Sequence, residues 1–187
     1  MFNNIINRLI NKFVIKEYLY KAELKEKIIL DNKSISLNTT TYKDIDYIKE
    51  YYSNEISDDK LKILKKRIDE EKVDLFSIKL NDVIVGYCSL SYKKMKENSI
   101  KNDILVNENQ VYLFDDYIFK KYRGNRLHFY SIVIRLNYAI KNRKKEALVC
   151  VYSWNKSSYY NYEKIGFKKI KEYIYIKILN KLIENGK

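Results

Sequence analysis

Apolar residues recur along this chain with two different periods, and each period predicts a type of secondary structure. Within the first 24 residues the apolar side chains lie mostly three or four positions apart, and Arg8, Lys12 and Lys16 interrupt them. The apolar residues with this spacing are Phe2, Ile5, Ile6, Leu9, Ile10, Phe13 and Val14. We therefore predict a basic amphipathic helix over residues 2–24, within an N-terminal unit over residues 1–26. A folded domain over residues 27–187 is expected to follow it.

A strand and two helices are predicted next. The strand lies around residues 35–37. Thr41 followed three residues later by Asp44 has the pattern of a capping box, which predicts that a helix begins there. A second helix is predicted from about Asp58, where apolar residues recur among lysines. The two helices are expected to cover one edge of a sheet.

The clearest hairpin joins two runs rich in β-branched and aromatic residues, 73–80 and 83–92. Asn81 and Asp82 separate the runs and tolerate the positive φ angles that a two-residue turn requires. Gly86 inside the second run predicts a bulge or a close approach of another backbone.

The remaining segments continue the alternation of strands and helices. They are a polar connection or extended hairpin at 93–109, a strand at 110–119, a helix at 127–140, a strand at 147–152, a helix at 157–165 and one or two strands at 167–179. Helices and strands in this order predict a mixed α/β fold with helices on both faces of one sheet.

Composition narrows the classes of partner. The chain has 187 residues, with 46% hydrophobic and 33% charged residues, which fits a single folded domain. The net charge of +13 favours an anionic partner: nucleic acid, a membrane surface or a phosphorylated small molecule. The lysines are scattered and form no arginine-rich block, so nucleic acid is not expected as the main target.

Cys88 and Cys150 lie inside apolar runs and lack the CxxC spacing of a metal site. Core thiols in a reducing cytoplasm are therefore expected, with neither a disulfide nor a metal. No apolar run is long enough to cross a membrane. The basic segment 2–24 could still lie on an anionic membrane surface, but packing against the domain or a partner is the preferred interpretation.

A basic turn joins the strand at 110–119 to the helix that follows it. Residues 115–128 read DDYIFKKYRGNRLH, and they direct backbone N–H groups and a positive helix end at one point. Such a turn predicts a phosphate site.

Two motifs in this half of the chain resemble the GNAT superfamily of acyl-CoA-dependent N-acyltransferases. The turn from Tyr122 to His128 is similar to the family's Arg/Gln-x-x-Gly-x-Gly/Ala turn, with Arg126 and His128 in place of the second and third small residues. The segment from Asn155 to Phe167 matches Asn-x-x-Ala/Ser-x-x-x-Tyr-x-Lys-x-Gly-Phe at every anchored position. The resemblance covers about residues 28–178.

The resemblance implies a mixed, mostly antiparallel central sheet with helices on both faces and a site for acetyl-CoA. Backbone amides of the turn would hold the pyrophosphate, while backbone groups near Ile118 and Phe119 would pair with the pantetheine arm and supply an oxyanion donor. Asn155 would touch the cofactor arm or cap the following helix. The implied cofactor residues are Ile118, Phe119, Arg123, Gly124, Asn125, Arg126, Leu127, His128, Asn155 and Ser158.

Two of these residues leave alternatives open. Arg126 could clamp the phosphates or remain a solvated arginine at the helix start. His128, the single histidine, could contact phosphate or water, or pack in the first helical turn. A role as catalytic base is not expected, because its position in the family faces the cofactor phosphates.

Acyl transfer to an amine needs a base for the amine, a donor for the oxyanion and an acid for the departing thiolate. The resemblance places Tyr162 as that acid; a packing role is the alternative. Where the family carries its usual glutamate, this chain has Tyr112, so Asp115 and Asp116 are the candidate bases. They should face opposite sides of the strand, and Asp116, on the side of Ile118, is preferred. Otherwise the pair orients a cationic acceptor, or a water chain removes the proton.

The function expected from these residues is transfer of an acetyl group to the primary amine of a small molecule by direct attack on the thioester. The basic surface favours an acceptor that is anionic or that carries a phosphate or a nucleotide. The alternative is a non-catalytic GNAT-fold binding module, tethered through residues 2–24 to a membrane or a protein partner. A homodimer is compatible with either function.

Overall fold

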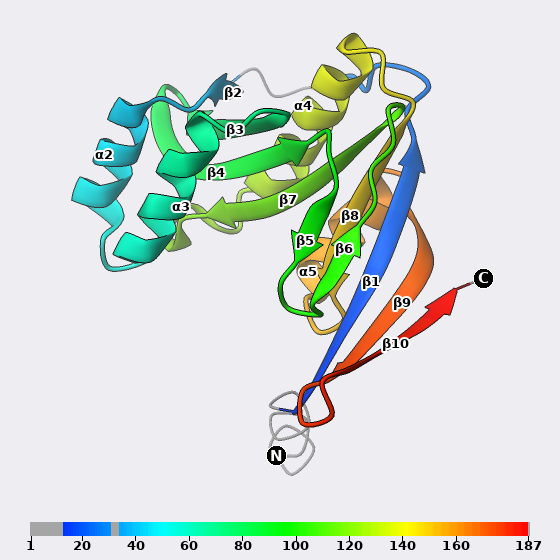
Figure 1. Ribbon diagram of the computed structural model, residues 1–187. Helices are drawn as coiled ribbons and strands as arrows, with labels where there is room; N and C mark the ends of the chain where they lie inside the picture. Colours follow the sequence, from blue (N-terminus) through cyan, green and yellow to red (C-terminus); the bar gives the residue numbers. More distant parts are fainter. Residues whose placement is uncertain (1–12, 31–33, 187) are drawn as a thin grey trace.

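The computed structural model describes residues 13–30 and 34–186, and an eight-stranded sheet runs through them (Figure 1). In order across the sheet, its strands are β10 (Lys181–Gly186), β9 (Lys168–Ile176), β1 (Val14–Glu23), β8 (Glu146–Tyr152), β7 (Gln110–Ile118), β4 (Val83–Ser91), β3 (Val73–Leu80) and β2 (Ile35–Thr39). Within this part of the chain, β7 and β8 are the only parallel neighbours. The expected mixed, mostly antiparallel sheet is confirmed.

The parallel strands separate along their length. Their ladder runs only from the pair Gln110–Glu146 to the pair Leu113–Val149. Beyond it β7 stays paired with β4 as far as Ile118, while β8 stays paired with β1 as far as Tyr152. Residues 114–118 and 150–152 therefore line a gap in the hydrogen bonding of the sheet, called here the β7–β8 opening (Figure 1).

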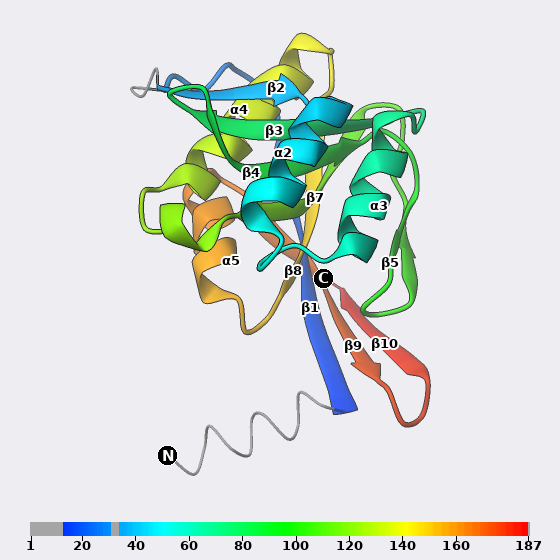
Figure 2. The same cartoon turned by 90° about the vertical axis from the view of Figure 1, so that its left-hand side faces the viewer.

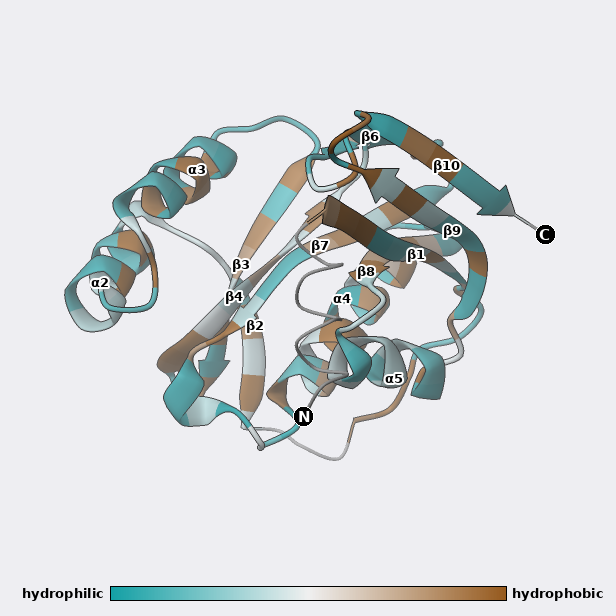
Figure 3. Cartoon of the chain, turned by 90° about the horizontal axis from the view of Figure 1, so that it is seen from below, coloured by the Kyte–Doolittle hydropathy of each residue, from teal (hydrophilic) through white to brown (hydrophobic). Residues whose placement is uncertain are grey.

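Helices cover both faces of the sheet (Figure 2). On one face α4 (Leu127–Lys141) and α5 (Lys156–Lys164) pack over a core that includes Val111, Leu113 and Val149. On the other lie α2 (Tyr42–Tyr52), α3 (Asp58–Ile68) and a hairpin of β5 (Met95–Glu97) and β6 (Asn102–Ile104). Teal and brown residues alternate along α2 and α3, as expected of amphipathic helices that bury one side (Figure 3).

Local signals placed several elements correctly. Thr41 and Asp44 form the predicted capping box of α2. Asn81 and Asp82 take positive φ angles of 47° and 65° in the turn between β3 and β4. The backbone of β7 approaches Gly86 closely, as predicted, since a Cβ at residue 86 would lie 2.2 Å from the carbonyl oxygen of Tyr117. The segment 93–109 contains the β5–β6 hairpin.

The predicted N-terminal helix is wrong for Val14–Glu23, which form strand β1; residues 2–12 lie outside the described part of the chain. The helical spacing does not continue past Val14. Tyr18, Leu19 and Tyr20 are consecutive apolar residues, a pattern that suits a strand covered on both faces. The division at residue 26 is wrong for the same reason, because β1 lies between β8 and β9 inside the sheet. None of the helices in residues 13–30 and 34–186 has the length and apolar character needed to cross a membrane.

Candidate functional site

A β-bulge shapes one wall of the β7–β8 opening. Ser89 pairs with Phe114 and Tyr87 with Tyr117, so Cys88 alone faces both Asp115 and Asp116. Asp115 takes the left-handed conformation, with φ 57°. The extra residue in β7 reverses the alternation of side chains beyond it. As expected, Asp115 and Asp116 contact opposite sides, α3 and α4–α5 respectively.

Asp116 is the centre of a buried polar network on the α4–α5 side. Arg135 of α4, which is completely buried, lies 2.7 Å from Oδ1 and also donates to Oδ2 at 2.8 Å. The Tyr162 hydroxyl donates to the same Oδ2 at 2.8 Å, and His128 Nε2 lies 3.2 Å from it. Four contacts from three side chains hold this carboxylate in place.

This network decides the charge of Asp116. Burial alone would raise the pKa of its carboxyl group, but Arg135 and His128 outweigh burial and lower the pKa far below its ordinary value. A carboxylate stabilised so strongly in its ionised form does not take a proton from an amine near neutral pH. Its surroundings therefore do not support Asp116 as the base and instead suit it to holding Tyr162.

Asp115 is also engaged. Lys60 Nζ lies 2.5 Å and 2.6 Å from its two carboxylate oxygens, and Arg67 forms a second ion pair with it. The Arg67 guanidinium also lies over the ring of Phe114, at 4.7 Å from its centroid. The contacts with these two cations occupy both carboxylate oxygens of Asp115 and anchor α3 to the bulge.

Tyr162 lies inside this network, with 1% of its surface exposed. Burial, followed by the charge of Asp116, raises the pKa of its hydroxyl well above 10. The group therefore stays protonated, which is the state that a proton donor requires.

His128 links Asp116 to α5. Its Nδ1 lies 3.0 Å from Nδ2 of Asn161, and an amide nitrogen can only donate, so Nδ1 is the acceptor. These partners assign the proton of a neutral imidazole to Nε2, which donates to Asp116. His128 is thus a structural member of the network, consistent with the interpretation that it packs in the first helical turn.

The turn before α4 has the backbone expected of an anion site. Gly124 has φ 87°, and Arg126, the residue before the helix, has φ 54°, a conformation that glycine adopts more readily. No side chain caps the first N–H groups of α4. Arg123 and Arg126 are exposed beside them, and Arg123 Nε donates to the carbonyl oxygen of Ile118 at 3.0 Å. Exposed cations and uncapped N–H groups meet at the end of the β7–β8 opening.

Other predicted cofactor groups already have partners in the chain. The Phe119 N–H donates to the carbonyl of Val85 at 3.0 Å, so it is not available as an oxyanion donor in this structure. Asn155 caps α5, as one alternative predicted, by accepting from the N–H of Ser158 at 3.3 Å. The Asn125 amide closes the turn on the Tyr122 carbonyl at 3.2 Å, while Leu127 is buried at the start of α4.

The sequence patterns considered above assign no role to Arg135, although the sequence contains a signal for one. It is a charged residue on the apolar side of a helix, one turn after Ser131 and beside Ile132 and Leu136. A buried arginine requires a partner of opposite charge, and the adjacent strand carries two aspartates.

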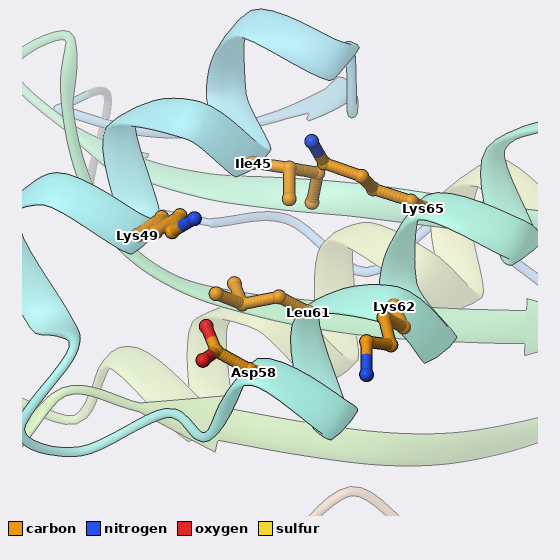
Figure 4. A pocket seen from close by; sticks show the side chains of 6 residues that line it. All are labelled: Ile45, Lys49, Asp58, Leu61, Lys62 and Lys65. Atoms are coloured by element: carbon orange, nitrogen blue, oxygen red, sulfur yellow. The ribbon is translucent and has the colours of Figure 1, made fainter.

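A separate depression of about 320 Å³ lies between α2 and α3 (Figure 4). Its lining includes Lys49, Lys62 and Lys65, but none of the residues that line the β7–β8 opening. Lys62 and Lys65 are paired with Asp59 and Asp46. This depression is therefore distinct from the candidate site. Across the described residues, no three His, Cys, Asp or Glu side chains are arranged to hold a metal.

Solved structures share this arrangement of elements. The chain is similar to a GCN5-related glucosamine N-acetyltransferase region of a fungal multi-domain GH3 β-N-acetylglucosaminidase, with a TM-score of 0.64 and 10% identity over 99% of this chain and 23% of that one. It is also similar to a GCN5-related N-acetyltransferase from Sphaerobacter thermophilus, with a TM-score of 0.60 and 12% identity over 98% and 56% of the two chains. A GCN5-related N-acetyltransferase from Kribbella flavida gives a TM-score of 0.55 and 7% identity over 89% and 60%.

At these identities the likeness concerns the fold. The chain spans less than two thirds of the length of each of these proteins. No protein-family model and no curated protein matches the sequence.

Proposed function

The chain has the GNAT fold, and we propose that it is an acyl-CoA-dependent N-acyltransferase that transfers an acetyl group to a primary amine. One observation carries the proposal. The β7–β8 opening leads to the uncapped start of α4, where two exposed arginines lie, and the protonated Tyr162 is buried on the same side of the sheet.

The turn before α4 fits the diphosphate of coenzyme A. Its uncapped N–H groups and the positive end of the helix favour an anion, and Arg123 and Arg126 supply two further cations. A Cβ at Gly124 would meet no atom within 4 Å, so a ligand can approach the backbone there. The same contacts would hold any acyl-CoA, and the acetyl group remains part of the proposal.

Acetyl-CoA would supply the acetyl group as a thioester, which an amine can attack directly. The opening between β7 and β8 would receive the thioester arm, because the backbone edges of the two strands diverge there. Tyr162 would protonate the departing thiolate. For this step the Tyr162 hydroxyl must give up its hydrogen bond to Asp116 and donate to the sulfur instead. Asp116 then still accepts hydrogen bonds from Arg135 and His128.

Because Tyr162 is buried, there is a second candidate function, a GNAT-fold binding module without catalysis. A tether to a membrane or partner would then have to use residues before Val14, since β1 belongs to the sheet. Cys88 and Cys150 are free thiols, which fits the cytoplasmic location proposed for either function.

Calorimetric titration with acetyl-CoA and with free coenzyme A tests the proposal. Saturable binding that weakens in R126A supports it, and turnover with a panel of primary amines then separates the enzyme from the binding module. An exposed arginine away from the turn, Arg143, provides the control variant R143A, which should bind like the wild type. Absence of binding at millimolar acetyl-CoA would overturn the enzyme proposal.

A further inference from the structure

Two glutamates meet under the β5–β6 hairpin, on the side of the sheet away from Tyr162. Glu17 of β1 is 2% exposed, and Ser99 donates to its Oε1 at 2.5 Å. The same hydroxyl lies 3.0 Å from Oε1 of Glu97. Tyr112 of β7 donates to the other oxygen of Glu97 at 2.8 Å. One serine hydroxyl therefore bridges two carboxylates.

This cluster spans the β7–β8 opening. Tyr112 belongs to the short ladder where β7 and β8 still pair, and Glu17 is the partner of Tyr152 at the far end of β8. Tyr112 also occupies the position where the resemblance to N-acyltransferases would place a glutamate. A carboxylate from β5 thus reaches, through the Tyr112 hydroxyl, the place where a base was expected.

The two sides of the opening carry different functional groups. The uncapped start of α4 and Tyr162 belong to the side covered by α4 and α5, whereas Glu17 and Glu97 lie on the side covered by α3 and the hairpin, where Lys60 and Arg67 pair with Asp115. The bulge in β7 produces this separation, because it turns Asp116 away from the side on which Tyr112 lies. An acyl donor held on the α4–α5 side and an amine that enters from the other side would meet in the opening.

Glu17 is poorly stabilised as an anion. Its Oε2 has no hydrogen-bond partner in the described part of the chain, and no lysine or arginine there forms an ion pair with it. Burial raises the pKa of its carboxyl group to about 7; Ser99 opposes this shift and the charge of Glu97 adds to it. Glu17 therefore changes its protonation state close to neutral pH.

The groups that face Glu17 are acidic or neutral. They are Glu97 from β5, Cys150 and Tyr152 from β8, and Tyr173 from β9, and Tyr112 of β7 joins the cluster through Glu97. Lys60 and Arg67 on this side pair with Asp115, and no lysine or arginine of the described residues forms an ion pair with Glu17 or Glu97, so the cluster attracts a proton or an ammonium group.

We propose that Glu17 accepts the proton of the attacking amine through Ser99 and that Glu97 seats the amine as an ammonium ion. The inference rests on the proposed acetyl transfer and names its acceptor class, a cationic primary amine. It differs from the anionic acceptor that the net charge suggested, because the Glu17–Glu97 cluster is acidic whereas the charge of the whole chain is positive.

Ser99 and Glu97 are partly exposed, while Glu17 is buried, so the amine meets the first two residues. The Ser99 hydroxyl takes one proton from the ammonium and passes its own to Glu17. The nitrogen lone pair then forms the C–N bond as the C–S bond breaks, and Tyr162 protonates the thiolate. The remaining excess proton on nitrogen restores the Tyr162 hydroxyl, and Glu17 later releases its proton to water.

Trp154, the single tryptophan, offers a reporter that does not depend on activity. It is 61% exposed and stacks on Tyr152 at 5.1 Å between ring centroids. Tyr152 is the strand partner of Glu17, and the charges of Glu17 and Glu97 raise its pKa after the larger effect of burial. A change in the charge of Glu17 should therefore alter the fluorescence of Trp154.

The first experiment titrates this fluorescence with pH in the wild type, E17Q and E184Q. Glu184 of β10 is an exposed glutamate that pairs with Lys171 of β9, and it serves as the matched control. We expect the fluorescence of the wild type and of E184Q to change with a midpoint near pH 7. This transition should be absent in E17Q. H128N should also keep it, which excludes His128 as the source. A midpoint that persists in E17Q would overturn the inference.

The second experiment measures acetylation of spermidine and of glucosamine 6-phosphate, with acetyl-CoA binding measured alongside. E17Q should bind acetyl-CoA like the wild type, lose turnover with spermidine at least tenfold and lose the rise of kcat between pH 6 and 8. E97Q should raise the KM for spermidine. Wild-type turnover with an unchanged pH profile in E17Q, or preference for the phosphate-bearing amine, would refute the inference while acetyl transfer stands. Failure of the wild type to bind acetyl-CoA would refute both.

Discussion

Arg135 and Asp116 form an ion pair that joins the middle of α4 to the bulge of β7, with 2.7 Å between Nη1 and Oδ1. Arg135 also donates to the carbonyl oxygen of Ser89 on β4 at 3.0 Å. A single side chain therefore fixes the helix behind the proposed phosphate-binding turn to two strands, one of which is a wall of the opening. Its role is to hold the turn and Tyr162 in register.

Removing one partner of this pair should destabilise the protein strongly. In D116N the guanidinium of Arg135 loses its counter-charge while it remains buried, which costs about 3–5 kcal/mol in comparable pairs. Urea denaturation would measure the change. The exposed pair of Asp59 and Lys62 offers the control D59N, whose effect should stay below about 1 kcal/mol. Equal effects of the two variants would contradict this account.

The same pair predicts a loss of stability in acid. The folded state lowers the pKa of Asp116 below its ordinary value of 3.8, so its contribution is fully present above that pH. The contribution is lost as the pH falls further, through the range where the folded state becomes protonated. The drop in unfolding free energy below pH 4 should therefore be smaller in the double variant D116L/R135M than in the wild type.

Replacement of Tyr162 by phenylalanine should lower turnover more than affinity. The hydroxyl is the proposed acid for the thiolate, and such groups contribute about 10²–10⁴-fold to rates. We expect kcat to fall by roughly a hundredfold, with acetyl-CoA binding little changed. The exposed Tyr160 provides the control Y160F. Unchanged turnover in Y162F would remove Tyr162 from the mechanism and leave it a packing residue.

Replacement of Arg126 by glycine should separate the effect of backbone strain on stability from the effect of the side chain on phosphate binding. Its φ of 54° costs an L-residue about 1–2 kcal/mol, and glycine relieves this cost in part while adding chain entropy to the unfolded state. R126G should therefore be at least as stable as the wild type but bind acetyl-CoA about tenfold more weakly, as expected for one lost charged contact. Tight binding by R126G would show that the arginine is only solvated.

Many features of the fold were predictable because they depend on neighbours in the sequence. The capping box at Thr41, the turn at Asn81 and the glycine that ends α5 are such features, and each lies where its pattern indicated. The tight turn before α4 was predictable for the same reason, since Gly124 and Arg126 act through their own backbone angles.

Features that depend on sheet order were not predictable in this way. Residues 2–14 have helical spacing, but Val14 begins a strand whose place is set by pairing with β8 and β9, more than a hundred residues away. Glu17 and Ser99 likewise meet across 82 positions. Their proximity requires knowing that β1 adjoins β8 and that the hairpin covers both. No local pattern contains that information.

Gly86 controls the position of β7, and its substitution should show this. A Cβ at residue 86 would lie 2.2 Å from the carbonyl oxygen of Tyr117, so G86A must push the strands apart. We expect a loss of about 1–3 kcal/mol in unfolding free energy and weaker acetyl-CoA binding. In G186A the nearest atom is 3.5 Å from the new Cβ, so this variant is the control and should be nearly neutral.

The raised pKa of Glu17 predicts a stability change opposite in sign to that of Asp116. Its ordinary value is 4.5 and its value in the fold is about 7, so between these pH values the folded state binds more protons than the unfolded state. Stability should therefore fall as the pH rises from 4.5 to 7, by up to about 3 kcal/mol from this group. Glutamine keeps the shape of the side chain and removes the titration, so E17Q should lack this component.

Urea denaturation at pH 5 and pH 8 would measure the difference. E17Q should gain stability relative to the wild type at pH 8 and be close to it at pH 5, whereas E184Q should follow the wild type at both. The measurement needs no substrate, because it reports only the cost of ionising a carboxylate beneath the β5–β6 hairpin. Parallel pH dependence of the wild type and E17Q would show that Glu17 is not the group that titrates near neutrality.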